Sequence, residues 1–423
     1  MRMSRKLLSS IAMTIPRPIR RGLKTQVLPP VLRTVRSIRE GAPDRPEARE
    51  YRVAGQETFA GYYEIQPISA DGQAVLAHAS PVARRALDGS ESVAVGWFDI
   101  ASGEWHPVAD TQLWCWQMGA RLRWWDSAGP RTLAFNAMID GAPAHCLADK
   151  DGGMRRHCDV PLFDVREDAG IGLSLNFARL ARCRPGYGYP LLEDPFARQN
   201  LPDGDGVTLV DLATGKGELA YAMPRFAELV PGADAGQYHY LNAALLSPAG
   251  ARFSVLYKRL PEPDDVHGWT VDAVVGNCDG SGLMRVPLNG RASHYWWLDE
   301  DRIAYTDNTG IFSEYVVFDC RDGSLSPLSS TMPKVDGHPS QHEESGQWVT
   351  DTYPDLYGDQ TLFVLDRDGG NRRELGRLPA DRRYQDEWRC DLHPRWSRDG
   401  KLVVVDSTHE GYRALYLVDA GDR

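Results

Sequence analysis

The stretch Trp388–Lys401 constrains the fold more than any other part of the chain. Its core reads His-Pro-Arg-Trp-Ser-Arg-Asp-Gly-Lys. This pattern predicts a short strand, a tight Asp-Gly turn and a second strand that starts at Leu402. Related patterns recur along the chain, so we interpret the stretch as the clearest copy of a repeated β unit.

Seven such units can be recognised, each with a first strand, a turn, and further strands that often end in Asp. First strands are anchored at Gln66–Gly72, Leu122–Trp125, Leu162–Val165, Ala244–Gly250, His294–Asp299, His338–Ser340 and His393–Trp396. Third strands are visible at Val95–Asp99, Val207–Asp211, Tyr315–Asp319, Leu362–Asp366 and Leu415–Asp419. One unit is lengthened by an insertion near residues 178–206.

Units of this kind bury their faces by stacking around an axis, which predicts an all-β fold, a seven-bladed β-propeller over residues 49–423. The last unit lacks an outer strand after Asp419, and residues 49–54 can supply it and close the ring. Two alternatives stay open at this stage. They are an open β-sandwich pair and a six-bladed ring, because the second and third units are weakly marked.

Charge divides the chain into a basic N-terminal arm, residues 1–48, and an acidic body. The first 40 residues hold ten Lys or Arg and one Glu, a net +9, so a chain total of −10 leaves −19 for the rest. An acidic body argues against a general nucleic-acid binder. The arm mixes its charge with apolar residues, which suits peripheral contact with an anionic membrane, a partner protein or a solvated tail. A secretory signal is less favoured, because no small-x-small cleavage site follows the short apolar run Leu7–Ile15.

The seven cysteines are scattered and never spaced as Cys-x-x-Cys. This spacing argues against a disulfide framework and against a zinc–thiolate site, and it favours a reducing compartment. No run approaches the roughly 18 apolar residues of a membrane-spanning helix. We therefore expect a cytoplasmic, monomeric protein, with a periplasmic location less favoured.

Propeller geometry brings the starts of inner strands and the ends of second strands to one mouth of the central channel. Among them, His338 and His393 begin neighbouring units, and Asp391 stands two residues before His393. Residues two apart on an extended chain face the same way, so these three side chains can converge as a mixed nitrogen and oxygen ligand set for a divalent metal. The alternative is that each histidine caps a strand end by a hydrogen bond.

Other ionisable side chains are expected at the same mouth. His294 can act as a proton acceptor, or pack as a core histidine beside the tryptophans that follow it. Lys258 and Arg259 end a second strand, where either can hold a carboxylate or remain a solvated rim charge. The insertion segment Arg184–Tyr189 is basic and aromatic, which suits an acidic sugar or a lid without a ligand. The loop at His409 completes the predicted substrate-binding set.

Three segments together resemble the oligogalacturonate lyases, which are seven-bladed propellers with a TolB-like repeat. The segments are Asp336–Ser340, Gly346–Asp355 and His393–Lys401. The resemblance covers roughly residues 240–420 and implies a manganese site, with zinc or calcium as alternatives, held by His338 and His393. In that family a third histidine and a glutamine complete the site, where this chain has Asp391 and Trp388.

The same resemblance implies His294 and Arg259 as catalytic residues, Arg259 being only a loose counterpart, and ulvan-cleaving propeller lyases add Tyr187. Arg184, Tyr189, Lys258 and His409 would then bind substrate. The implied reaction is β-elimination on an oligosaccharide that contains uronic acid, and the acidic body favours short oligosaccharides over polymers. The alternative is a non-catalytic propeller that binds a glycan or a protein.

Overall fold

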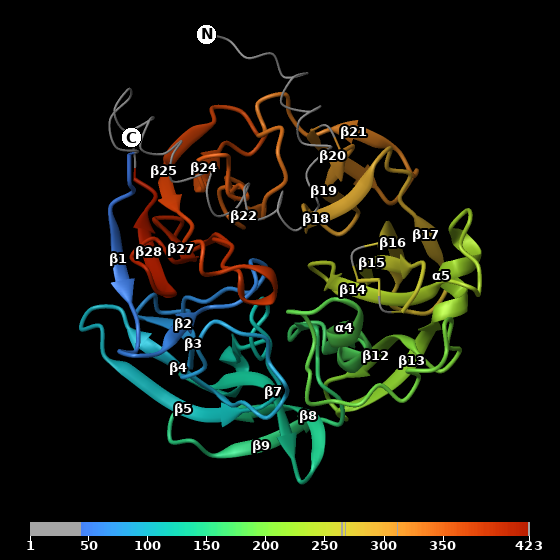
Figure 1. The fold of residues 1–423 in the computed structure, drawn as a ribbon, viewed down its shortest axis with the longest axis horizontal. Helices are drawn as coiled ribbons and strands as arrows, with labels where there is room; N and C mark the ends of the chain where they lie inside the picture. The colour runs from blue at the N-terminus through green and yellow to red at the C-terminus, as the bar shows by residue number, and fades with distance from the viewer. Residues whose placement is uncertain (1–43, 264, 267, 311, 422–423) are drawn as a thin grey trace, which may run out of the picture.

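The computed structural model describes residues 44–421 except 264, 267 and 311. In this part of the chain, seven four-stranded antiparallel sheets surround a central axis (Figure 1). The predicted seven-bladed β-propeller is therefore confirmed, and the open sandwich and the six-bladed ring are wrong. The basic segment 1–40, for which membrane contact was predicted, lies outside the described residues.

The seven sheets, called blades 1 to 7 in chain order, each run from an inner strand to an outer strand. Blade 1 contains β2 (Glu57–Phe59), β3 (Ala74–Ser80), β4 (Val93–Asp99) and β5 (Trp105–Thr111). Blade 2 contains β6 (Arg123–Trp124), β7 (Leu133–Ile139), β8 (Ala142–Ala148) and β9 (Met154–Cys158). Blade 3 contains β10 (Asp164–Arg166), β11 (Ile171–Ser174), β12 (Gly206–Asp211) and β13 (Lys216–Ala222). Blades 4 and 5 are β14 (Tyr238–Leu246), β15 (Arg252–Leu260), β16 (Thr270–Asn277), β17 (Leu283–Arg285); and β18 (Arg291–Trp297), β19 (Arg302–Asn308), β20 (Ser313–Asp319), β21 (Leu325–Pro327). Blades 6 and 7 are β22 (Ser340–Gln341), β23 (Trp348–Thr350), β24 (Asp359–Leu365), β25 (Arg373–Pro379); and β26 (Arg395–Trp396), β27 (Leu402–Ser407), β28 (Ala414–Asp419), with β1 (Ala48–Tyr51) as the outer strand.

The ring closes between the two ends of the chain. Strand β1 pairs antiparallel with β28, with Ala48 opposite Val418 and Tyr51 opposite Leu415. The N-terminal strand therefore completes blade 7, as the missing outer strand in the sequence predicted. This pairing joins the N-terminal segment of the described chain to the last blade.

Adjacent blades are also joined by buried tryptophans near the inner strands. The indole of Trp124 in blade 2 donates to the carbonyl of Pro67 in blade 1 at 2.9 Å, and Trp297 in blade 5 donates to Leu245 in blade 4 at 3.2 Å. Each indole buries a large apolar surface while its N–H group finds an acceptor. The tryptophans of the repeat thus hold neighbouring blades in register.

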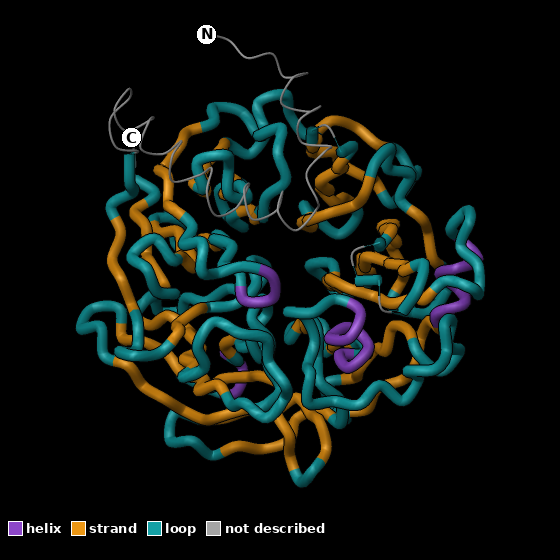
Figure 2. Tube along the Cα trace, viewed as in Figure 1, coloured by secondary structure: helices purple, strands orange, loops and turns teal. Residues whose placement is uncertain are grey.

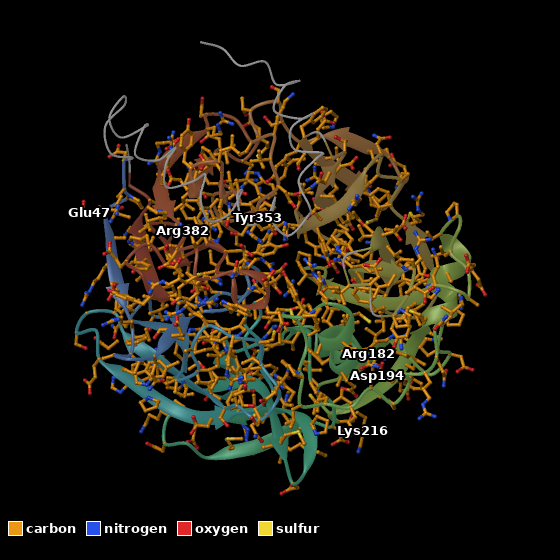
Figure 3. All side chains as sticks on the ribbon, in the orientation of Figure 1. Glu47, Arg182, Asp194, Lys216, Tyr353 and Arg382 are labelled. Carbon is orange, nitrogen blue, oxygen red and sulfur yellow. The ribbon has the colours of Figure 1, made fainter. Side chains whose placement is uncertain are left out.

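Among the residues that the structure describes, helices are few, and they lie in segments between the strands (Figure 2). Helix α4 (Phe177–Cys183) belongs to the insertion between β11 and β12 of blade 3, and α5 (Met223–Leu229) links blades 3 and 4. Buried Arg179 of α4 fixes the insertion through an ion pair with Asp194 at 3.3 Å, and Arg182 lies 3.7 Å from the same carboxylate (Figure 3). These ion pairs therefore hold the insertion in one conformation, and the same insertion contains Tyr187. Neither helix, nor either of the short 3-10 turns Asp126–Ala128 (η2) and Asp386–Trp388 (η3), is long and apolar enough to span a bilayer.

Candidate functional site

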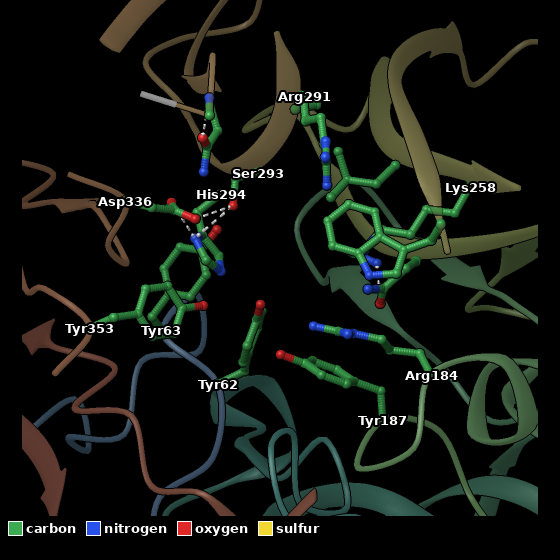
Figure 4. Close-up of a pocket in the computed structure, with 17 residues that line it drawn as sticks. Tyr62, Tyr63, Arg184, Tyr187, Lys258, Arg291, Ser293, His294, Asp336 and Tyr353 are labelled. Atoms are coloured by element: carbon green, nitrogen blue, oxygen red, sulfur yellow. Dashed lines mark hydrogen bonds and ion pairs between the residues drawn. The ribbon is translucent and has the colours of Figure 1, made fainter. Parts of the chain in front are cut away.

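A cavity of about 310 Å³ opens near the centre of the ring (Figure 4). Its walls come from the segment between β2 and β3, from the blade 3 insertion, and from blades 4 to 6. The lining residues that carry polar or aromatic groups are Tyr62, Tyr63, Arg184, Tyr187, Asn242, Lys258, Trp269, Arg291, Ser293, His294, Asn308, Asp336 and Tyr353. Four of the sequence-predicted site residues, Arg184, Tyr187, Lys258 and His294, meet in this cavity.

Irregularities in two inner strands turn polar side chains toward the cavity. The pairing of β18 with β19 shifts between Ala292 and Tyr295, and Ser293 and His294 lie inside that interruption. The pairing of β14 with β15 shifts in the same way after Asn242. Such bulges re-aim side chains at functional sites, and here they place Ser293, His294 and Asn242 in the lining.

His294 forms a dyad with Asp336 across the junction of blades 5 and 6. Its Nδ1 atom lies 3.0 Å from Asp336 Oδ1, and the Ser293 hydroxyl donates to the other carboxylate oxygen at 2.6 Å. Burial and the neighbouring His338 lower the pKa of His294, although Asp336 opposes them. A neutral imidazole whose Nδ1–H is held by a carboxylate leaves Nε2 free to accept a proton. Figure 4 shows this second nitrogen turned away from Asp336.

The opposite wall of the cavity carries three cations around one indole ring. The Lys258 ammonium lies 4.4 Å from the centroid of Trp269, and the guanidinium groups of Arg184 and Arg291 lie 5.6 and 5.4 Å from it. No ion pair joins any of the three to a carboxylate among residues 44–421 as described. Burial, followed by the charges of Arg184 and Arg389, moves the pKa of Lys258 well below its ordinary value. This wall is suited to binding an anion.

Next to the cavity, His338, Asp391 and His393 bring their ligand atoms within 4.8 Å of one another. All three side chains are buried. The predicted convergence of two imidazoles and a carboxylate from blades 6 and 7 is therefore present, and we call these residues the channel cluster. The His338 ring lies 4.2 Å from that of His294, and the His393 ring lies 4.8 Å from that of Tyr62, in each case between centroids.

Hydrogen bonds hold the Nδ1 atom of each imidazole in the channel cluster. His338 Nδ1 contacts both oxygens of Asp351, at 2.9 and 3.0 Å, and His393 Nδ1 contacts the carbonyl of Gly61 at 3.0 Å. Because a carbonyl can only accept, Nδ1 of His393 carries the proton. Both Nε2 atoms are buried without a hydrogen-bond partner. Two unpartnered nitrogens beside a carboxylate fit a divalent cation, and an Asp behind a ligand histidine is a common supporting partner.

The backbone around His338 and His393 differs from the conformation that the sequence predicted. The inner strands begin later than predicted, at Ser340 and Arg395, so neither His338 nor His393 starts a strand. His393 is left-handed, with φ of 45°, a costly conformation for a residue other than glycine. The extended conformation predicted at His393 is therefore wrong, although the side chains of Asp391 and His393 converge as predicted.

Arg389 connects the channel cluster to the cavity. Its Nε atom donates to Asp391 Oδ2 at 2.8 Å, and one of its terminal nitrogens donates to the Tyr187 hydroxyl at 2.8 Å. Burial opposes the charge of this guanidinium, but Asp391 raises its pKa well above the ordinary value. The Tyr187 hydroxyl therefore accepts a hydrogen bond from this guanidinium, and its O–H group can donate to another acceptor.

Three of the seven predicted catalytic and substrate-binding residues do not line the cavity. Arg259 faces away from Lys258, and its guanidinium donates to Asp272 at 2.8 Å. Tyr189 is fully buried, stacks on Phe177 and contacts Asn136 through its hydroxyl at 2.7 Å. His409 lies in the turn after β27, where its Nδ1 contacts the Ser407 hydroxyl at 2.9 Å.

Sequence reasoning missed Tyr62, Asp336 and Arg389 as members of the site. For Asp336 a signal was present, because Asp336-Gly-His338-Pro and Asp391-Leu-His393-Pro are two copies of one Asp-x-His-Pro pattern. In each copy the Asp reaches the histidine of the preceding blade: Asp336 contacts His294, and Asp391 joins His338. Tyr62 lies in a loop that no repeat marks.

The sequence matches no protein-family model, and comparison with curated proteins finds no relative. Solved structures do resemble the fold. An oligogalacturonate lyase in complex with manganese superimposes with a TM-score of 0.60 at 14% identity, covering 90% of this chain and 98% of that one. An oligogalacturonate lyase from Vibrio parahaemolyticus gives a TM-score of 0.59 at 13% identity, with coverage of 90% and 98%. These neighbours confirm the predicted propeller class over nearly the whole chain.

Proposed function

We propose that this propeller is a lyase-like enzyme that cleaves short oligosaccharides containing uronic acid by metal-dependent β-elimination. The observation that carries the proposal is the adjacency of three elements. These are a wall of unpaired cations, a neutral histidine held by a carboxylate, and the channel cluster, all around one cavity. The likeness in fold to two oligogalacturonate lyases supports the same reaction class.

The cationic wall would bind the uronate carboxylate. Lys258 and Arg184 reach the cavity without carboxylate partners, so an incoming carboxylate would relieve their mutual repulsion. The face of Trp269 next to them suits the apolar face of a sugar ring. The neighbouring Arg259 is engaged with Asp272, so within the pair we assign carboxylate binding to Lys258.

His294 would act as the base. Its Nε2 would take the proton from C5 of the uronate, the electrons of that C–H bond would form the C4=C5 double bond, and the bond from C4 to the leaving oxygen would break. Asp336 would hold the ring and stabilise the imidazolium that forms.

A tyrosine would return a proton to the leaving oxygen. Figure 4 shows Tyr62 and Tyr187 directing their hydroxyl groups into the cavity. Burial raises the pKa of Tyr62 well above its ordinary value, so its phenol stays protonated and can donate. Tyr187 is held by Arg389, which can stabilise a phenolate after transfer.

The channel cluster would hold the metal through His338, His393 and Asp391. A nitrogen and oxygen set of this kind suits manganese, iron or zinc. A divalent cation bound there would supply positive charge next to the cavity, which would stabilise the negative charge that develops as the C5 proton leaves.

Incubation of the protein with Mn²⁺ and a panel of 4-linked uronate di- and trisaccharides tests the proposal by mass spectrometry. Elimination predicts two products whose masses add up to that of the substrate, one of them unsaturated. Products that contain one added water would identify a hydrolase instead. Binding without any product would favour a non-catalytic glycan-binding propeller.

A further inference from the structure

A second group of metal-ligand side chains lies in blade 2, at the outer side of the ring where Figure 1 draws β8 and β9. His145, His157 and Cys158 bring their ligand atoms within 4.8 Å of one another. His145 and Cys158 are buried, and His157 is half-buried. None of the three lines the cavity described above. We call them the edge cluster.

A bulge explains how neighbouring residues of one strand reach the same point. On β8, His145 pairs with Cys158 of β9 and Cys146 pairs with Arg156, so His157 is an extra residue on β9. A bulge places two residues of one strand opposite a single residue of the other. It thereby directs His157 and Cys158, which would face opposite ways in a regular strand, toward His145.

Two of the three distances between the ligand atoms match a tetrahedral centre. The two Nδ1 atoms of His145 and His157 are 3.3 Å apart, and Cys158 Sγ lies 3.5 Å from His157 Nδ1. Ligands at about 2.05 Å for nitrogen and about 2.3 Å for sulfur around tetrahedral zinc are separated by about 3.3 Å for a nitrogen pair and about 3.5 Å for a nitrogen–sulfur pair. Trp125 packs against both imidazoles, with centroids 5.5 and 4.8 Å away, and so fixes the rings.

The surroundings favour neutral imidazoles. Burial lowers the pKa of His145 well below its usual range, with His157 and Arg123 adding to the effect, and burial followed by Arg155 lowers that of His157. Burial, with smaller contributions from Asp159 and Asp211, raises the pKa of the Cys158 thiol to about 12. The thiol is therefore not a reactive thiolate, and a bound cation would have to displace its proton, as thiolate-binding metals do.

We propose that His145, His157 and Cys158 form a zinc site that ties the outer strand β9 to β8. One thiolate and two imidazoles select a borderline-soft cation over Mg²⁺, Ca²⁺ or Mn²⁺. Three protein ligands leave a fourth coordination position to water or another small ligand. The role is structural, because the site lies apart from the cavity.

The test uses the full chain with His338→Ala and His393→Ala, which removes the two histidines of the channel cluster. After chelation and dialysis against Zn²⁺, elemental analysis should find one zinc per chain, and adding Cys158→Ser should reduce it to none. Titration with Co²⁺ should give a thiolate-to-cobalt charge-transfer band in the near ultraviolet. That band should vanish in Cys158→Ser and persist in the control Cys146→Ser, whose thiol faces the carbonyl of Phe135.

Circular dichroism of each variant establishes that the fold is kept. Equal zinc content with and without Cys158, or a cobalt spectrum free of thiolate charge transfer, would overturn the proposal. If Cys158→Ser fails to fold, His157→Gln replaces it, and the same two readings decide.

Discussion

The channel cluster and the edge cluster each combine two histidines with one further ligand, but their surroundings differ. The channel cluster has a carboxylate as its third ligand and adjoins a cavity that contains His294 and three cations. The edge cluster has a thiol, packs against Trp125 and sits between two strands of one blade. We therefore propose different roles for these two similar ligand groups, chemistry for the channel cluster and architecture for the edge cluster.

The largest expected effect separates the two clusters directly. Replacing His393 with Ala should lower turnover by more than about 100-fold, because losing even an outer-shell partner of a metal typically costs about 10–100-fold. Cys158→Ser should leave turnover unchanged. Product formation and bound metal are measured in both variants to check this. An equal loss of turnover in the two variants would contradict the proposed difference in function between the clusters.

The second expected effect concerns the base beside the channel cluster. His294→Gln should reduce kcat by about a hundredfold or more, the range expected when general-base catalysis is removed. The variant should keep its metal, since His294 is not part of the channel cluster. Steady-state kinetics with elemental analysis measures both. A kcat within a few-fold of the wild-type value would show that another residue acts as the base.

The third effect concerns the cationic wall. Lys258→Met should raise KM by about 10–100-fold with a smaller change in kcat, since a hydrogen bond to a charged group contributes about 1.5–3 kcal/mol. Arg259→Lys is the matched control, because that residue faces Asp272 and should leave KM unchanged. If Arg259→Lys has the larger effect, carboxylate binding belongs to Arg259, the other residue that the sequence offered for this role.

The smallest effect is a pH dependence of binding. The pKa of Lys258 is depressed in the free protein, and a bound carboxylate would raise it. Affinity should therefore be full below the depressed pKa and fall as the pH rises through and above it, with proton uptake on binding in that window. Calorimetry in two buffers of different ionisation enthalpy measures the uptake. Lys258→Arg should bind without it, and equal uptake in that variant would contradict the assignment.

The sequence allowed prediction of the ring more completely than of the site. Seven units, the insertion and the closing strand β1 followed from repeated turns and alternating strands, because a propeller reuses one local pattern. Convergence of His338, Asp391 and His393 was also predictable from their places in adjacent units. The predicted strand start at His393 was not correct, because a left-handed residue there replaces the extended chain.

Other parts of the site depend on contacts that no local pattern encodes. Tyr62 reaches the cavity from a loop in the first unit, while its partner His393 lies in the last. Cysteine spacing did not predict the edge cluster, because its ligands come from two strands. A bulge in β9 brings the adjacent residues His157 and Cys158 to the same side of the strand. Lys258 and Arg259 were equivalent in sequence, and only the structure separates the face that lines the cavity from the face that pairs with Asp272.

The most direct test of the central claim is the absorbance of unsaturated uronate product from one sample of protein in three states. The wild-type chain is assayed as loaded with Mn²⁺, after chelation, and after Mn²⁺ is restored, with a 4-linked uronate trisaccharide as substrate. An elimination site at the channel cluster predicts absorbance that grows, stops and resumes. A rate that is unaffected by chelation, or no absorbance in any state across the uronate panel, would contradict it.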